Sequence, residues 1–204
     1  MSKHTLYGDS VSGNCLKGKY VCDLLSISYD WIETSVMKQE TRTPQFLALN
    51  PVGQVPLLVL ADGRKLAQSN AIILHLAEGS RLIPQDAYAR AKMHEWLFWE
   101  QYNHEPNIAS RRFLVGYVKK EPPPHMLPRG EAALAHMEQQ LQQTPYLVGE
   151  ALTLADIALI AYTRVAEEGG FELAKYPALQ AWIARVERDL GLEPVSPKRS
   201  GEAA

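Results

Sequence analysis

The sequence predicts a fold of class α+β/α, in which a βαβαββα domain is followed by an all-helical domain. Over residues 1–79, short apolar runs typical of strands alternate with segments whose apolar residues recur at helical spacing. Asp62-Gly63 separates two short apolar runs and is typical of a hairpin turn. From Asp86 onward, the periodic segments all repeat at helical spacing. We therefore expect two domains, residues 1–79 and residues 86–204, joined by a linker around residues 79–85.

The first domain is expected to alternate strands with helices. The strands are expected at residues 4–7, 29–34, 57–60 and 64–67. The helices are expected at residues 14–26, 44–49 and 69–78. Thr43-Pro44 supports the second helix, because threonine is a favourable cap and proline is favourable at the first helical position. Ser69 is expected to cap the third helix.

The second domain is expected to contain a long helix and three shorter ones. Asp86 is expected to cap the long helix, which extends to about Tyr117 and bends near Pro106. The chain then breaks at residues 121–124, where three prolines follow one another. The other helices are expected at residues 130–143, after residues 153–156, and after Pro177. The polar tail after Gly191 is expected to be loosely held.

Composition and charge exclude several classes of function. The formal net charge of −2 gives no basic surplus for a nucleic-acid partner, and no apolar stretch is long enough to span a membrane. Cys15 and Cys22 match neither a zinc motif nor a Cys-x-x-Cys pair, which favours a reducing compartment. The first residues lack the apolar core of a signal peptide, so we expect a cytoplasmic location. His104-Glu105 has no partner at metal-ligand spacing, so no metal is expected.

Val55-Pro56 lies where a loop enters the third expected strand. Proline is tolerated at this position because no donor of the strand ladder is lost there. A cis bond at Pro56 would turn the main-chain groups of Val55 away from the sheet, where an extended peptide could pair with them. A trans proline in an ordinary turn is the alternative.

Two further segments lie at expected helix starts. Gln68-Ser69-Asn70 opens a helix, where free N–H groups attract a carboxylate, and Gln68 can both donate and accept. Residues 10–15, Ser-Val-Ser-Gly-Asn-Cys, precede and begin the first helix, whose dipole stabilises a thiolate. Each segment taken alone is also compatible with an ordinary loop or cap.

Taken together, the chain resembles the glutathione transferases over essentially its whole length. The resemblance depends on Val55-Pro56 and on Gln68-Ser69-Asn70-Ala71-Ile72 within a βαβαββα unit that precedes a helical domain. Residues 153–156, with Leu154 and Ile157, also resemble the folding signature of that family's helical domain. The resemblance implies a thioredoxin-like first domain, glutathione as co-substrate and no permanently bound cofactor.

The resemblance also implies the residues that bind glutathione. Val55 would hydrogen-bond the cysteinyl part through its main chain, with Pro56 in the cis form. Gln68 and Ser69 would hold the γ-glutamyl end. Gln54 stands where many members carry a lysine for the glycyl carboxylate, which removes one charge from that subsite.

Ser12 is the first choice for the group that activates the glutathione thiol, as in serine-type members of the family. Ser10 is an alternative if the loop is longer, and Asn14 could donate through its amide. Cys15 could instead form a mixed disulfide with glutathione and give reductase or thiol-transfer chemistry.

The second substrate is expected to contact the helical domain. Trp99, Tyr102, Asn103 and Arg111 lie along the long helix and are candidates for its pocket, although an aromatic stripe at this spacing also suits core or dimer packing. The resemblance implies a homodimer and transferase activity toward a small, hydrophobic electrophile, with possible peroxidase or thiol-transfer side activity. A non-catalytic binding or regulatory protein of the same fold is the alternative, and a lyase, dehalogenase or isomerase is a third possibility.

Overall fold

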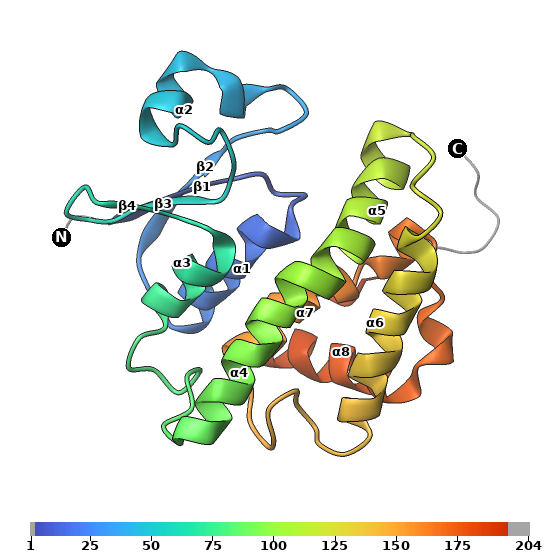
Figure 1. The fold of residues 1–204 in the computed structure, drawn as a ribbon. Coiled ribbons are helices and arrows are strands. Elements are labelled where there is room, and N and C mark those ends of the chain that lie inside the picture. The colour runs from blue at the N-terminus through green and yellow to red at the C-terminus, as the bar shows by residue number, and fades with distance from the viewer. Residues whose placement is uncertain (1–2, 196–204) are drawn as a thin grey trace. The chain divides into compact units, whose positions relative to one another are not determined.

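The computed structural model describes residues 3–195 and divides the chain into two compact units. One unit comprises the residues up to Ile83, and the other begins at Pro84. The fold has the predicted class, with an α/β first unit and a helical second unit (Figure 1).

The first unit is built on a four-stranded mixed sheet with strand order β2-β1-β3-β4. β1 pairs with β2 in parallel and with β3 antiparallel, and β3 pairs with β4 antiparallel. The strands are β1 (His4–Gly8), β2 (Tyr29–Glu33), β3 (Leu57–Val59) and β4 (Lys65–Ala67). The helices are α1 (Gly13–Leu24), the 3₁₀ turn Glu40–Arg42, α2 (Pro44–Leu49) and α3 (Ser69–Leu76).

The central strand β1 distributes its side chains to the two faces of the sheet. Figure 1 shows α1 and α3 on one face and α2 on the other. The buried Leu6 lies against Gly18 of α1, whereas the next residue, Tyr7, makes an edge contact with Phe46 of α2. This alternation is the period of two that a strand imposes, and it gives the sheet an apolar layer on each side.

Apart from an isolated bridge between Tyr146 and Gly149, the regular secondary structure in the described part of the second unit is helical. Its α-helices are α4 (Ala87–Trp99), α5 (Ser110–Phe113), α6 (Met126–Leu141), α7 (Leu154–Thr163) and α8 (Pro177–Leu190). The π-helical segments Glu100–Ala109 and Leu114–Val118 join α4 and α5 into one long helical stretch, and the short 3₁₀ turns are Ala166–Gly169 and Leu173–Lys175. All ten residues of α7 are buried, so α7 is the core helix of this unit. In the part of the chain from residue 3 to residue 195, no helix is both long and apolar enough to cross a bilayer.

Several helix boundaries differ from the sequence prediction. The cap of α3 is Gln68 rather than Ser69, which is the first residue of the helix. α6 begins at Met126 rather than at residue 130, because Pro128 is tolerated within the first turn of a helix. Pro106 lies inside a π-helical segment, whose wider turns accommodate the missing N–H group. The expected loose tail falls mainly on residues 196–204, which lie outside the described residues.

Candidate glutathione site

Ser12 occupies the N-cap position of α1. Its backbone is extended, with φ −89° and ψ 115°, and its carbonyl accepts hydrogen bonds from the N–H groups of Cys15 and Leu16 at 3.0 Å. The Ser12 hydroxyl does not cap the helix, and the residue is only partly buried. The Ser12 side chain therefore lies at the positive end of the helix dipole.

Two carboxylates hold the loop that carries Ser12. The Asp9 carboxylate accepts hydrogen bonds from the N–H groups of Val11 at 3.1 Å and Val36 at 2.8 Å. The Glu33 carboxylate accepts from the Ser10 N–H at 2.9 Å and from the indole N–H of Trp31 at 2.8 Å. Partial burial opposes ionisation of Glu33, but these donors outweigh it and hold the pKa of this carboxyl below its usual value. The loop between β1 and α1 is thus fixed from both sides, although Ser10 itself remains exposed.

Cys15 lies one turn into α1 and is fully buried. Burial raises the pKa of its thiol to about 11, although a hydrogen bond with the Ser12 side chain and the Asp9 backbone oppose the rise. A thiol with this pKa is protonated at neutral pH and is a poor nucleophile. The geometry therefore disfavours Cys15 as the residue that forms a disulfide with glutathione.

The peptide bond between Val55 and Pro56 is cis, as the resemblance implies. The paired registers of β3 begin at Leu57, so the main-chain groups of Val55 lie outside both strand ladders. The preceding loop is held by the Asn50 amide, which donates to the Gln54 carbonyl at 2.8 Å, while Gln54 itself is exposed. The main chain of Val55 thus lies outside the strand ladders, where a bound peptide could pair with it by strand addition.

Arg42 is a cation near this segment that the sequence interpretation did not select. Its guanidinium donates to the Val52 carbonyl at 3.2 Å and lies so close to Gly53 that a Cβ there would be 2.6 Å from Nη1. A positive charge thus lies beside the turn that leads to Gln54. No local sequence signal distinguishes Arg42, because its position depends on the fold of residues 40–53.

The start of α3 is linked to the start of α1 by side-chain hydrogen bonds. The hydroxyl of the buried Ser69 donates to Asn14 Oδ1 at 3.1 Å and accepts from Lys17 Nζ at 3.3 Å. Lys17 Nζ also donates to Asn70 Oδ1 at 3.2 Å. Gln68 has φ 72° and remains exposed before this network. The structure therefore brings Ser69 and Asn14 together, and it adds Lys17, which sequence interpretation missed because a lysine in a helix is ordinarily solvated.

The four candidates for a second-substrate pocket do not share one environment in the described helical unit. Trp99 packs against Trp96 and His136, with ring centroids 5.1 Å apart in both pairs. Tyr102 is 84% exposed, and the Asn103 amide donates to the Trp99 carbonyl at 3.4 Å.

The fourth candidate, Arg111, is held elsewhere in the helical unit. Its Nε donates to the Gly169 carbonyl at 2.7 Å.

His104 is fully buried, and its Nε2 lies 2.9 Å from Thr163 Oγ1, which suits a structural role. Within residues 3–195, no group of three or more His, Cys, Asp or Glu side chains is placed to hold a metal ion.

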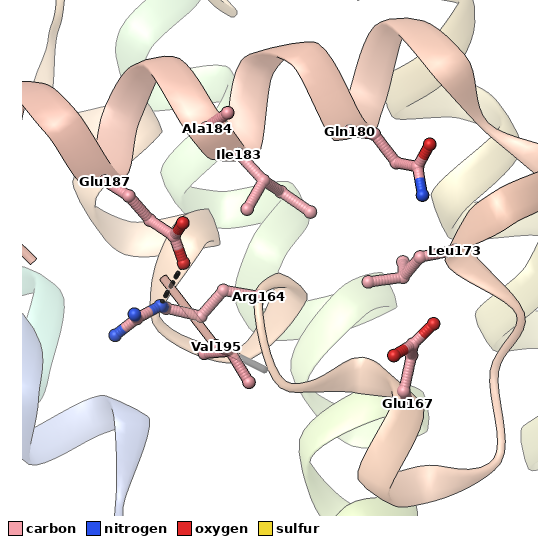
Figure 2. A pocket seen from close by; sticks show the side chains of 8 residues that line it. All are labelled: Arg164, Glu167, Leu173, Gln180, Ile183, Ala184, Glu187 and Val195. Atoms are coloured by element: carbon pink, nitrogen blue, oxygen red, sulfur yellow. Dashed lines mark hydrogen bonds and ion pairs between the residues drawn. The ribbon is translucent and has the colours of Figure 1, made fainter. Parts of the chain in front are cut away.

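A cavity of about 200 Å³ lies in the helical unit, and none of these candidates lines it (Figure 2). Its lining consists of Arg164, Glu167, Leu173, Gln180, Ile183, Ala184, Glu187 and Val195. Its cation is already paired, because Arg164 Nε donates to Glu187 at 2.8 Å. The volume is below the ~300 Å³ at which ligand pockets usually begin. The cavity therefore offers no convincing place for the second substrate.

Comparisons with known proteins match both units. The family model described as Glutathione S-transferase, N-terminal domain, matches residues 11–78, and the model described as Glutathione S-transferase, C-terminal domain, matches residues 94–189. The Glutathione S-transferase-like protein LUC7 from Fusarium is 31% identical over 158 residues, covering 72% of this chain and 71% of that protein.

Solved structures agree with the family models. A glutathione S-transferase from Pseudomonas fluorescens Pf-5 is 46% identical, with a TM-score of 0.86 and coverage of 91% of this chain and 95% of that chain. A possible glutathione S-transferase from Rhodopseudomonas palustris is 42% identical, with a TM-score of 0.90 and coverage of 96% and 100%. Because both domains are matched and their order is the same, the chain belongs to the glutathione S-transferase family.

Proposed function

We propose that this chain is a glutathione transferase whose first unit binds glutathione and activates its thiol. The observation that carries the proposal is the position of Val55 directly before β3, where its main chain lies outside both strand ladders. Glutathione would lie extended along Val55, with its cysteinyl N–H and C=O paired to that main chain. A homologue from Sulfitobacter, 20% identical and similar in fold, was solved with bound glutathione, which supports the choice of ligand.

The two ends of the tripeptide would be held by different groups. Gln68 and Ser69 at the start of α3 suit the γ-glutamyl end, because the free N–H groups of a helix start attract its carboxylate. Gln54 would face the glycyl carboxylate, and Arg42 beside Val52 would supply the charge that Gln54 lacks. No metal or prosthetic group is required by this arrangement, since the nucleophile belongs to the ligand.

Ser12 would activate the thiol by donating a hydrogen bond to the sulfur at the start of α1. The hydrogen bond and the helix dipole both favour the thiolate, so the thiol pKa would fall from its free value of ~8.5. The thiolate would then attack an electrophilic carbon of a small, hydrophobic second substrate, and the sulfur–carbon bond would form as a leaving group departs or an unsaturated acceptor is protonated. Ser10 and Asn14 remain alternatives as the donor. A mixed disulfide at Cys15 is the least favoured route, because that thiol is buried.

The finer features of the proposal follow from family membership. The candidates for contact with the second substrate remain Trp99, Tyr102, Asn103 and Arg111. A role in detoxification fits a hydrophobic electrophile. A peroxide is an alternative electrophile. A cytoplasmic homodimer is proposed on the same basis, and the two free, buried cysteines suit a reducing compartment.

The proposal is tested by replacing Ser12 with alanine. S12A should slow conjugation of glutathione to a chromogenic aryl halide by about a hundredfold, as expected for loss of one donor to a developing charge. The dissociation constant for glutathione from calorimetry should change little, since the other contacts remain. The pH–rate profile should also shift to higher pH, because the bound thiol loses its hydrogen bond.

Matched variants distinguish the neighbours of Ser12. S10A should leave turnover unchanged, because the variant keeps the Ser10 backbone N–H that donates to Glu33 and holds the loop. If S12A retained full turnover while N14A or S10A abolished it, the activating role would move to that residue. Uptake of glutathione without conjugation or peroxide reduction would instead favour a non-catalytic binding protein.

A further inference from the structure

Lys17 is a fully buried lysine in the middle of α1. Burial of an ammonium group costs several kcal/mol unless hydrogen bonds and opposite charges compensate it. Two of its contacts lead to the start of α3, where Nζ lies 3.3 Å from Ser69 Oγ and 3.2 Å from Asn70 Oδ1. A residue that is costly to bury is thus directed at the segment that the proposed function assigns to the γ-glutamyl group.

The contacts of Lys17 fix the direction in which the Ser69 hydroxyl donates. Because Lys17 can only donate, the Ser69 oxygen must accept from it, and the Ser69 proton then goes to Asn14 Oδ1 at 3.1 Å. The hydroxyl is therefore occupied on both sides. The backbone N–H of Ser69, in the first turn of α3, belongs to the set of amides that lack a partner inside their own helix.

We propose that Lys17 is a positioning residue for glutathione: it holds Ser69 and Asn70 so that the first-turn amides of α3 receive the α-carboxylate of the γ-glutamyl group. The proposal rests on the proposed function, since it assumes that this group binds at the start of α3. Lys17 does not touch the ligand. It acts through Ser69, and Asn14 connects the same network to the start of α1, where the sulfur would lie.

The test is calorimetry with three ligands on wild type and K17M. The ligands are glutathione, glutaryl-Cys-Gly, which lacks the α-amino group, and 4-aminobutyryl-Cys-Gly, which lacks the α-carboxylate. K17M should weaken binding of the two ligands that carry the carboxylate by about tenfold, the loss expected when a charged hydrogen bond is no longer well placed. It should leave the affinity for 4-aminobutyryl-Cys-Gly within about twofold. In conjugation assays, KM for glutathione should rise while kcat at saturation is nearly unchanged.

K19M is the matched control, because Lys19 lies two residues along the same helix. Lys19 pairs with Asp23 at 2.9 Å and with the Tyr29 hydroxyl at 3.0 Å on the exposed side. Its removal should leave glutathione binding within about twofold of wild type. N70A, which removes one acceptor of Lys17, should show a smaller version of the K17M pattern. This variant also tests the proposal if K17M fails to fold.

The outcomes separate the inference from the function on which it rests. Absence of glutathione uptake by wild type would overturn the proposed function itself. Uptake by wild type with unchanged affinity in K17M or N70A would overturn only the positioning role. Equal weakening for all three ligands would also overturn it, because a general loss of structure does not distinguish the carboxylate.

Discussion

At the scale of single residues, chemistry at the start of α1 depends on exposure more than on residue type. Ser12 and Cys15 lie within one helical turn of each other, and both lie near the positive end of the helix dipole. Ser12 is partly accessible, whereas Cys15 is fully buried and has a thiol pKa of about 11. The more reactive of the two side chains, the Cys15 thiol, is therefore the one that the fold buries.

We predict that neither cysteine reacts with glutathione disulfide in the folded protein. Burial raises the pKa of Cys15 to about 11 and that of Cys22 to about 12, so at pH 8 only about one Cys15 thiol in a thousand is ionised. Mass spectrometry after incubation should show unmodified native protein, and both thiols should react once denaturant is added. A rapid adduct on native Cys15 would restore thiol-transfer chemistry as the leading reaction.

The same shift predicts how stability responds to alkaline pH. The folded pKa of Cys15 exceeds its ordinary value of 9.0, so the folded state holds the thiol proton more tightly than the unfolded state does. The stability that comes from the protonated thiol is therefore fully present below pH 9. It should be lost as pH rises toward about 11. C15A should reduce the slope of unfolding free energy against pH in this window, as measured by urea denaturation.

At the scale of secondary-structure elements, close packing and intrinsic helix propensity compete at particular positions. Gly130 lies in α6, where a Cβ would come 2.4 Å from the ring of Phe171. Gly116 lies in the helical segment Leu114–Val118, where a Cβ would meet nothing within 4 Å. Of the two glycines, only Gly130 is therefore required for the approach of another side chain.

We predict opposite signs for the two glycine-to-alanine substitutions. G130A should destabilise the protein by about 1–3 kcal/mol, because overpacking against a ring outweighs the gain in propensity. G116A should be neutral or stabilise it by up to about 1 kcal/mol. Thermal and urea denaturation of both variants provide the measurement. Stabilisation by G130A would mean that Phe171 moves aside freely.

At the scale of the whole helical unit, one buried carboxylate joins the start of α7 to the loop before it and to α8. Asp156 accepts hydrogen bonds from the Leu147 N–H, the Thr153 N–H and hydroxyl, and the indole N–H of Trp182, all within 2.9–3.0 Å. Burial raises the pKa of this carboxyl, and the four donors oppose the rise. Because α7 is the core helix, its capping box also fixes the loop before it and α8 beside it.

We predict that D156A destabilises the protein by about 3 kcal/mol or more, since several buried donors lose their acceptor at once. D86A is the matched control: Asp86 caps α4 from an exposed position through one bond from the Ala89 N–H at 2.8 Å. Loss of that cap should cost about 1 kcal/mol. Urea denaturation of both variants measures the difference, and equal costs would contradict a special role for Asp156.

Much of the fold and part of the candidate site could be predicted from local sequence. Strand and helix positions followed from periodicity, and Thr43 caps α2 as expected, with its hydroxyl accepting from the Phe46 N–H at 3.3 Å. The Thr153–Asp156 capping box is also present. The boundary at α3 was predicted one residue late, because Gln68 adopts φ 72° and serves as the cap. A left-handed glutamine is rare enough that sequence propensity does not indicate it.

The sequence by itself determined the order of elements, the family and the candidate ligand-binding segments, because periodicity, caps and the Val55-Pro56 and Gln68-Ser69 pairs are local properties of the chain. Only the tertiary structure decided which side chains are accessible and which meet across the first unit. It buried Cys15 and Lys17, and it brought Ser69 to Asn14 across 55 positions of sequence. Burial and long-range hydrogen bonding depend on how helices pack on the sheet, and no local pattern encodes that packing.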